Sequence, residues 1–160
     1  MATRSTPSTP STDEFLRLDR QICFSLNAAS RAFGGIYRTL LKDLGLTYPQ
    51  YLVMLVLWEA APEEGPIPVK RLGERLRLDS GTLSPLLKRL EANGLVRRER
   101  SATDERSVTI ALTPSGAALK ESAAEVPRKI AAATGFDLQE IESLRSQLDR
   151  LTTALDNATL

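Results

Sequence analysis

Residues 68–112 constrain the fold more than any other part of this sequence. The segment 68–76 places Val69, Leu72 and Leu76 on one face, which predicts a short amphipathic helix. Residues 77–79 leave room only for a tight connection. A second helix then begins with Asp79 or Ser80 as its cap and stops at residues 93–94, Asn-Gly. Its expected inward-facing residues are Leu83, Leu86, Leu87 and Leu90. Two short helices joined by a turn form a helix-turn-helix.

Two strand-like segments follow this pair of helices. Residues 107–112 alternate apolar Val108, Ile110 and Leu112 with smaller or polar neighbours, and residues 95–100 also have strand character. The polar stretch 101–105 between them suits the tip of a hairpin. A basic hairpin directly after a helix-turn-helix is typical of the wing of a winged-helix domain.

The charge of the chain is concentrated in the same region. The net charge of the whole sequence is +1, but residues 69–112 carry ten lysines and arginines against six acidic residues. A charge run of this kind is often only a solvated face. The ordered series of helix, turn, capped helix and basic hairpin instead favours duplex DNA as the partner.

A recognition helix enters the major groove with its N-terminus first, so short polar side chains meet the base edges there. The candidate DNA-binding residues of the second helix are Asp79, Ser80, Thr82, Ser84, Pro85, Lys88 and Arg89. Lys88 and Arg89, about two turns along, are expected to face a flanking phosphate strand. The arginines of the hairpin are expected to reach the backbone or an adjacent minor groove.

The N-terminal flank predicts a long helix over residues 13–44, capped by Thr12 or Asp13. Its apolar residues recur at helical spacing: Phe15, Leu18, Ile22, Leu26 and Ala29. The pair Gly34–Gly35 favours a kink or break in that helix, and Gly45 ends it. Thr47 then caps a helix whose residues 51–61 are so uniformly apolar that it should be buried in the centre of the domain.

The C-terminal flank begins a helix at Thr113–Pro114, which should run towards Pro127 and can restart beyond it before ending near Gly135. Residues 137–155 carry a narrow apolar stripe that seeks a partner helix: Ile141, Leu144, Leu148, Leu151 and Leu155. The expected fold is therefore mainly α with a small β-hairpin wing. It comprises a winged helix-turn-helix over about 62–112 and dimerisation helices over about 13–44 and 114–157, in a single domain of residues 13–160.

Dimerisation predicts two recognition helices presented to a pseudo-palindromic DNA operator. A monomer whose last helix folds back on its own core is the structural alternative.

Composition argues against an enzyme. The chain has no histidine and a single cysteine, Cys23, which removes most zinc ligand sets and every histidine-activated nucleophile. It also has no Gly-rich phosphate loop, and we expect neither a cofactor nor a metal. Residues 1–12 are predicted to be a disordered tail without the apolar core of a signal peptide, and no later run is long enough to span a membrane. These features predict a cytoplasmic protein that does not contact a membrane.

The segments 78–90, 93–96 and 104–108 resemble the winged-helix core of MarR-type repressors. The segments 18–24, 29–32, 47–51 and 57–59 are similar to the organic-hydroperoxide-sensing OhrR branch of that family. The resemblance implies that Asp104 helps to hold Arg106 at the DNA. It also implies that Cys23 is the peroxide sensor and that Tyr37 and Tyr48 hydrogen-bond its sulfur, partly across a dimer.

This assignment is chemically reasonable, because tyrosine hydroxyls stay protonated at neutral pH and can donate to a thiolate. Attack of the thiolate on an organic hydroperoxide yields sulfenic acid. With no second cysteine to trap that product, we expect a low-molecular-weight thiol to form a mixed disulfide, or oxidation to continue. The change should make the homodimer release its operator.

Several alternatives stay open. Cys23 can be a small buried hydrophobe, and Tyr37 and Tyr48 can be core aromatics. The chain can be a MarR-type repressor induced by a non-covalent small molecule such as a phenolic compound. Two further alternatives are a thiol peroxidase and an architectural DNA-binding protein without a switch.

Overall fold

The computed structural model describes residues 11–159 except residues 102 and 105. Most of the predicted disordered tail, residues 1–10, therefore lies outside the described residues. Residues 11 and 12 do not belong to a tail, because Ser11 caps a helix that begins at Thr12. The chain divides into two compact units, residues 1–36 and 37–160, and each is described by itself.

The first unit contains three separate helical segments where the sequence predicts one continuous helix from residue 13. Helix α1 covers Thr12–Phe15, a 3-10 turn covers Leu18–Arg20, and α2 begins only at Ile22. The side-chain amide of Gln21 donates to the carbonyl oxygens of Phe15 and Arg17, at 2.5 and 3.0 Å. These bonds satisfy carbonyls that a continuous helix would have used, so the predicted uninterrupted start was wrong.

The predicted cap was also wrong by one or two positions. Ser11, rather than Thr12 or Asp13, accepts from the backbone N–H of Glu14, and the Glu14 carboxylate accepts from the backbone N–H of Ser11. This reciprocal capping box satisfies two backbone donors at once.

Helix α2 runs without interruption over Ile22–Leu41, so the break expected at Gly34–Gly35 does not occur. A glycine destabilises a helix by only about 1 kcal/mol relative to alanine. The stability contributed by the other residues of this long helix exceeds two such penalties. A 3-10 turn, Lys42–Leu44, follows α2. Gly45 ends it in the left-handed conformation, with φ of 66°, as its predicted role as a stop requires.

The core of the second unit is built around α3, Tyr48–Ala60. Thr47 caps this helix, and Gln50 completes a capping box. The prediction of a buried central helix is confirmed. Its buried residues are Gln50, Tyr51, Val53, Met54, Val56, Leu57, Trp58 and Ala60.

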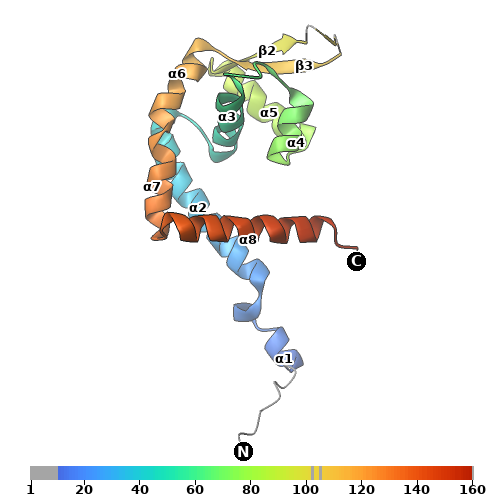
Figure 1. The fold of residues 1–160 in the computed structure, drawn as a ribbon, viewed down its shortest axis with the longest axis vertical. Coiled ribbons are helices and arrows are strands. Elements are labelled where there is room, and N and C mark those ends of the chain that lie inside the picture. The colour runs from blue at the N-terminus through green and yellow to red at the C-terminus, as the bar shows by residue number, and fades with distance from the viewer. Residues whose placement is uncertain (1–10, 102, 105, 160) are drawn as a thin grey trace, which may run out of the picture. The chain divides into compact units, whose positions relative to one another are not determined.

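The helix-turn-helix comprises α4, Val69–Leu76, and α5, Ser80–Ala92. Between them Arg77 adopts the left-handed conformation, with φ of 56°, and the backbone N–H of Leu78 donates to the Gly73 carbonyl at 2.9 Å. Gly73 is required here, because a Cβ at this position would lie 2.9 Å from the Leu78 carbonyl oxygen. Figure 1 shows α4 and α5 beside α3.

The wing is the hairpin of β2, Val96–Arg100, and β3, Val108–Leu112, within one residue of the predicted strands. A two-residue strand β1, Ile67–Pro68, pairs antiparallel with β3 and completes a three-stranded sheet of order β1-β3-β2. The sequence did not predict β1, because two residues are too few to show an alternating pattern.

Beyond the wing, α6 covers Pro114–Ala123, α7 covers Glu125–Thr134, and α8 covers Leu138–Asp156 (Figure 1). The cap at Thr113 and the stop at Gly135 are as the sequence indicates, and Asp137 caps α8. The break falls at Ala124 rather than at Pro127, which lies in the first turn of α7, where a missing N–H costs no helical bond. Among the described residues, no helix combines the length and apolar character needed to cross a membrane.

Candidate functional site

The N-terminus of α5 is organised by Asp79. Its carboxylate accepts from the backbone N–H of Thr82 at 2.8 Å and from the Thr82 hydroxyl at 3.0 Å. The backbone hydrogen bond from Thr82 is the larger cause that lowers the pKa of Asp79 below its ordinary value. Asp79 and Thr82 therefore hold each other, and these hydrogen bonds order the first turn of α5.

The other predicted residues of α5 share solvent exposure. The leucines on the opposite side, Leu83, Leu87 and Leu90, are buried, and Leu86 is half-buried. The exposed candidates are Ser80, Ser84, Pro85, Lys88 and Arg89. Pro85 lies inside the helix and has no N–H to donate, yet α5 continues through it. The exposed side of α5 therefore carries hydroxyl groups, Ser80 and Ser84, in its N-terminal half and two cations, Lys88 and Arg89, in its C-terminal half.

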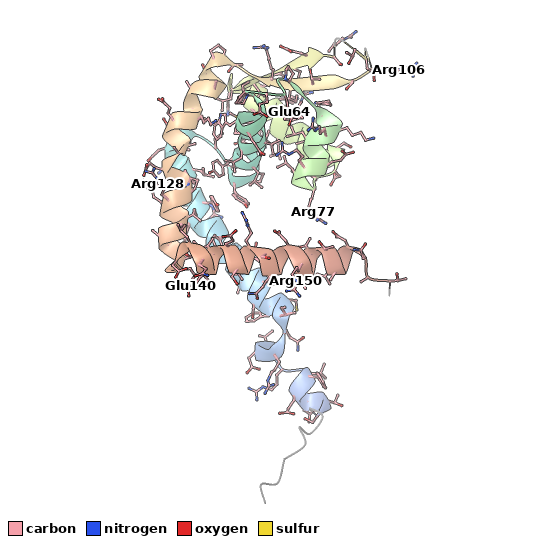
Figure 2. The ribbon with its side chains drawn as sticks, in the orientation of Figure 1. Glu64, Arg77, Arg106, Arg128, Glu140 and Arg150 are labelled. Carbon is pink, nitrogen blue, oxygen red and sulfur yellow. The ribbon has the colours of Figure 1, made fainter. Side chains whose placement is uncertain are left out.

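At the wing, the resemblance pairs Asp104 with Arg106. Asp104 Oδ1 accepts from the backbone N–H of Arg106 at 3.0 Å, and the Asp104 carbonyl accepts from the backbone N–H of Ser107 at 2.9 Å. The aspartate thus shapes the turn, and its contact with Arg106 among the described residues is to the backbone. Figure 2 shows Arg106 at the far end of the hairpin, where its side chain is exposed.

Two of the hairpin arginines form ion pairs within the protein, which the sequence did not predict. Arg97 pairs with Glu99 and also donates to the Leu112 carbonyl at 3.4 Å. Arg98 pairs with Glu91 of α5. Arg100 and Arg106 are exposed and have no ion-pair partner among the described residues, so these two are the free wing cations.

The pairing of Arg98 with Glu91 was missed at the sequence level. The only available signal was a seven-residue separation across the predicted stop at Asn93–Gly94. A glutamate near the end of a helix and an arginine in the next strand commonly have other partners, so this spacing alone could not have predicted the contact.

Tyr37 and Tyr48 lie together in the second unit, as neighbours in an aromatic cluster. Their ring centroids are 4.5 Å apart, and Tyr51 lies 5.9 Å from Tyr37. Burial, followed by the proximity of Tyr48 and Tyr51, raises the pKa of Tyr37 to about 12. Burial also raises the pKa of Tyr51. At neutral pH Tyr37 therefore keeps its proton and is available as a hydrogen-bond donor.

Cys23 lies in the first turn of α2, in the first unit, and is exposed. Its apolar neighbours are exposed as well, Ile22 by 66% and Phe24 by 45%. The interpretation of Cys23 as a packed core residue of its own unit is therefore not supported.

Comparison with known proteins adds independent information. A family model described as transcriptional regulator SarA/Rot matches residues 35–123. The HTH-type transcriptional regulator TtmR of Methylorubrum extorquens is 50% identical over 153 residues, 96% of this chain and 75% of TtmR. The organic hydroperoxide resistance transcriptional regulator of Bacillus subtilis is 45% identical over 142 residues, 89% of this chain and 94% of that protein.

Solved structures of AbfR of Staphylococcus epidermidis have the same fold. Reduced AbfR bound to DNA matches with a TM-score of 0.73 and 37% identity, over 92% of this chain and 100% of the AbfR chain. Overoxidized AbfR bound to DNA matches with a TM-score of 0.71 and 38% identity, over 91% of this chain and 99% of that one. The relatives named here are transcriptional regulators rather than enzymes. From its helix-turn-helix, its wing and these similarities together, the chain belongs to the SarA/Rot- and MarR-type winged-helix transcriptional regulators, and is a DNA-binding regulator of the OhrR type.

Proposed function

We propose that this protein is a homodimeric repressor that senses organic hydroperoxides through Cys23 and then releases its operator. The observation that carries the proposal is that the only cysteine of the chain is exposed at the start of α2, in a protein 45% identical to an organic hydroperoxide resistance regulator. The name of that relative indicates the class of inducer, and the cysteine supplies the chemistry.

DNA is contacted by α5 and the wing. The exposed hydroxyls of Ser80 and Ser84 suit base edges, and Lys88 and Arg89 suit phosphates. Arg100 and Arg106 extend the cationic surface along the hairpin. Asp79, Thr82 and Asp104 support these contacts by fixing local backbone geometry.

The sensing step is nucleophilic attack by the Cys23 thiolate on the outer oxygen of the hydroperoxide. The S–O bond forms as the O–O bond breaks, and the departing alkoxide takes a proton to leave as an alcohol. Cys23 is oxidised to sulfenic acid and the peroxide is reduced. Hydroxyl donors stabilise the thiolate, a role that the protonated Tyr37 and its neighbour Tyr48 can fill within a dimer.

The sulfenic acid then condenses with a low-molecular-weight thiol, giving a mixed disulfide and water. This branch is favoured over further oxidation as the releasing step, because a relative described as overoxidized was solved bound to DNA. The bulk of the added thiol destabilises the DNA-competent dimer. A destabilisation of about 3 kcal/mol lowers operator affinity roughly a hundredfold.

The test is operator binding by fluorescence anisotropy, with a duplex from the intergenic DNA beside the protein's own gene. Reduced wild type and Cys23→Ser are expected to bind alike. After stoichiometric cumene hydroperoxide and a small thiol, wild type should lose about a hundredfold in affinity. Cys23→Ser should lose none, because serine cannot form the sulfenic acid.

Ser25→Ala is the matched control, since Ser25 is an exposed residue of the same helix turn and its variant should respond like wild type. If wild type and Cys23→Ser both stay bound, or both are released, Cys23 is not the switch.

A non-covalent inducer is the second candidate function, and one feature favours it. A groove of about 470 Å³ lies against α3, α6 and α7, and its lining is mostly apolar with Glu59 and Lys120 beside it. Tyr51 and Trp58 contribute aromatic rings to this groove. A phenolic acid such as salicylate fits these features, and release of Cys23→Ser from DNA by salicylate without peroxide is the result expected of this candidate.

A further inference from the structure

Arg98 directs three of its polar groups toward α5. Its backbone N–H donates to Glu91 Oε1 at 3.1 Å, and its Nε lies 3.4 Å from Glu91 Oε2. Its Nη2 donates to the Ser84 carbonyl oxygen at 3.5 Å. One strand residue therefore holds both the middle and the end of the recognition helix.

The apolar contacts of the hairpin with α5 lie nearer its base. Val96 is buried, as are Leu87 and Leu90 of α5, and the Leu95 backbone N–H donates to the Leu90 carbonyl at 3.0 Å. Arg98 lies two residues farther along β2, paired with Ile110 of β3. Its bonds to Glu91 and Ser84 thus extend the attachment from the base of the hairpin toward its free half.

We propose that Arg98 is a positioning residue. Through Glu91 it holds the hairpin at a set angle to α5, so that the free wing cations and α5 reach one duplex together. This inference rests on the proposed contact of both elements with DNA. We assign Arg98 to positioning rather than to phosphate binding, because its Nε lies 3.4 Å from Glu91 Oε2.

The two roles of Arg98 predict opposite effects of Glu91→Gln. If Arg98 were a phosphate contact, removing the nearby negative charge and freeing the arginine would tighten DNA binding. If Arg98 positions the wing, the same change loosens the hairpin and weakens binding. Glu99→Gln is the matched control, since it removes one negative charge from the wing without touching α5.

The first measurement needs no DNA. A spin label is attached at Thr103→Cys, near the hairpin tip, in a Cys23→Ser background that leaves no other thiol. Glu91→Gln and Arg98→Gln are expected to increase label mobility, and Glu99→Gln is expected to leave it unchanged. Equal mobility in all of these proteins overturns the proposal.

The second measurement is affinity for a duplex selected from a random pool and for an unrelated duplex. Glu91→Gln is expected to weaken binding to the selected duplex about threefold to tenfold, as loss of one charge-assisted contact predicts. Glu91→Gln with Arg98→Gln should lose no more than the worse single variant, because both act through one contact. Arg98→Lys can still pair with Glu91, so it should lose less affinity for the selected duplex than Arg98→Gln does.

Binding to the unrelated duplex should change less, since loose electrostatic association does not require α5 and the wing to engage together. Tighter binding of the selected duplex by Glu91→Gln overturns the proposal. If wild type selects no duplex at all, the proposed DNA function fails, whereas the label mobility still decides whether Arg98 holds the wing.

Discussion

At the scale of single residues, Asp79 has a defined task. Its carboxylate accepts two hydrogen bonds from Thr82 at the start of α5, and its pKa lies below the ordinary value of 3.8. A side chain whose native pKa is depressed contributes stability at pH values above its unfolded pKa. That contribution is lost as the pH falls through the native pKa.

We expect Asp79→Asn to be nearly as stable as wild type at neutral pH, because asparagine is an equally good cap. On acidification below about pH 4 wild type should lose this contribution while the variant does not, so the stability difference should shift in favour of the variant. Urea unfolding at pH 7 and at pH 3 measures the difference. A difference that does not change with pH would show that the Asp79 cap does not depend on its charge.

At the scale of elements, the first turn of α6 is packed against the turn that precedes the wing. The Thr113 hydroxyl donates to the Gly94 carbonyl at 2.5 Å, and the Thr113 N–H donates to the Leu95 carbonyl at 3.1 Å. The Gly116 carbonyl accepts from the buried Trp58 indole N–H at 2.8 Å. These bonds tie α6 to both α3 and the wing.

Gly116→Ala should therefore destabilise the whole domain. A Cβ at this position would lie 1.9 Å from the Leu95 carbonyl oxygen, which is part of the backbone and has no rotamer with which to move away. The expected loss is about 1–3 kcal/mol, as for other overpacked positions. Ser115→Ala, on an exposed residue of the same turn, should leave the unfolding midpoint nearly unchanged. Thermal unfolding followed by circular dichroism compares the two, and equal midpoints would refute the close approach of α6.

At the scale of the whole molecule, each unit exposes apolar side chains that a folded monomer would normally cover. The first unit exposes Ile22, Phe24, Leu26 and Phe33, and α8 in the second unit exposes Leu144, Leu148 and Leu155. The apolar stripe at residues 137–155 predicts that a partner helix covers this side of α8. In the proposed homodimer a second copy of the chain supplies that helix.

Leu148→Glu is expected to shift the protein toward monomer, because it places a charge in that stripe. A weakening of dimerisation by tenfold or more is the expected size, since a buried leucine contributes roughly 1.5–3 kcal/mol. Gln147→Glu adds the same charge at the neighbouring polar position of α8 and should remain dimeric. Sedimentation velocity over a range of concentrations distinguishes the two variants. A Leu148→Glu protein as dimeric as wild type would exclude this stripe from the interface.

The sequence by itself determined the order of elements in the winged helix, the buried central helix and the caps at Thr47 and Thr113. It also narrowed the cap of α5 to Asp79 or Ser80, of which Asp79 caps the helix. These features depend on apolar spacing and on side chains that bond within three residues, so they can be seen in a short window of sequence. The motif similarity that indicated the family was equally local. The candidate DNA residues of α5 were placed on one helix for the same reason.

Only the tertiary structure decided which polar groups meet across elements. It paired Arg98 with Glu91, left Arg100 and Arg106 without an ion-pair partner among the described residues, and added β1 to the sheet. It also interrupted the first helix at Gln21, whose amide bonds two earlier carbonyls. Each outcome depends on competition among several possible partners, and the winner is set by which backbones packing brings within hydrogen-bonding distance.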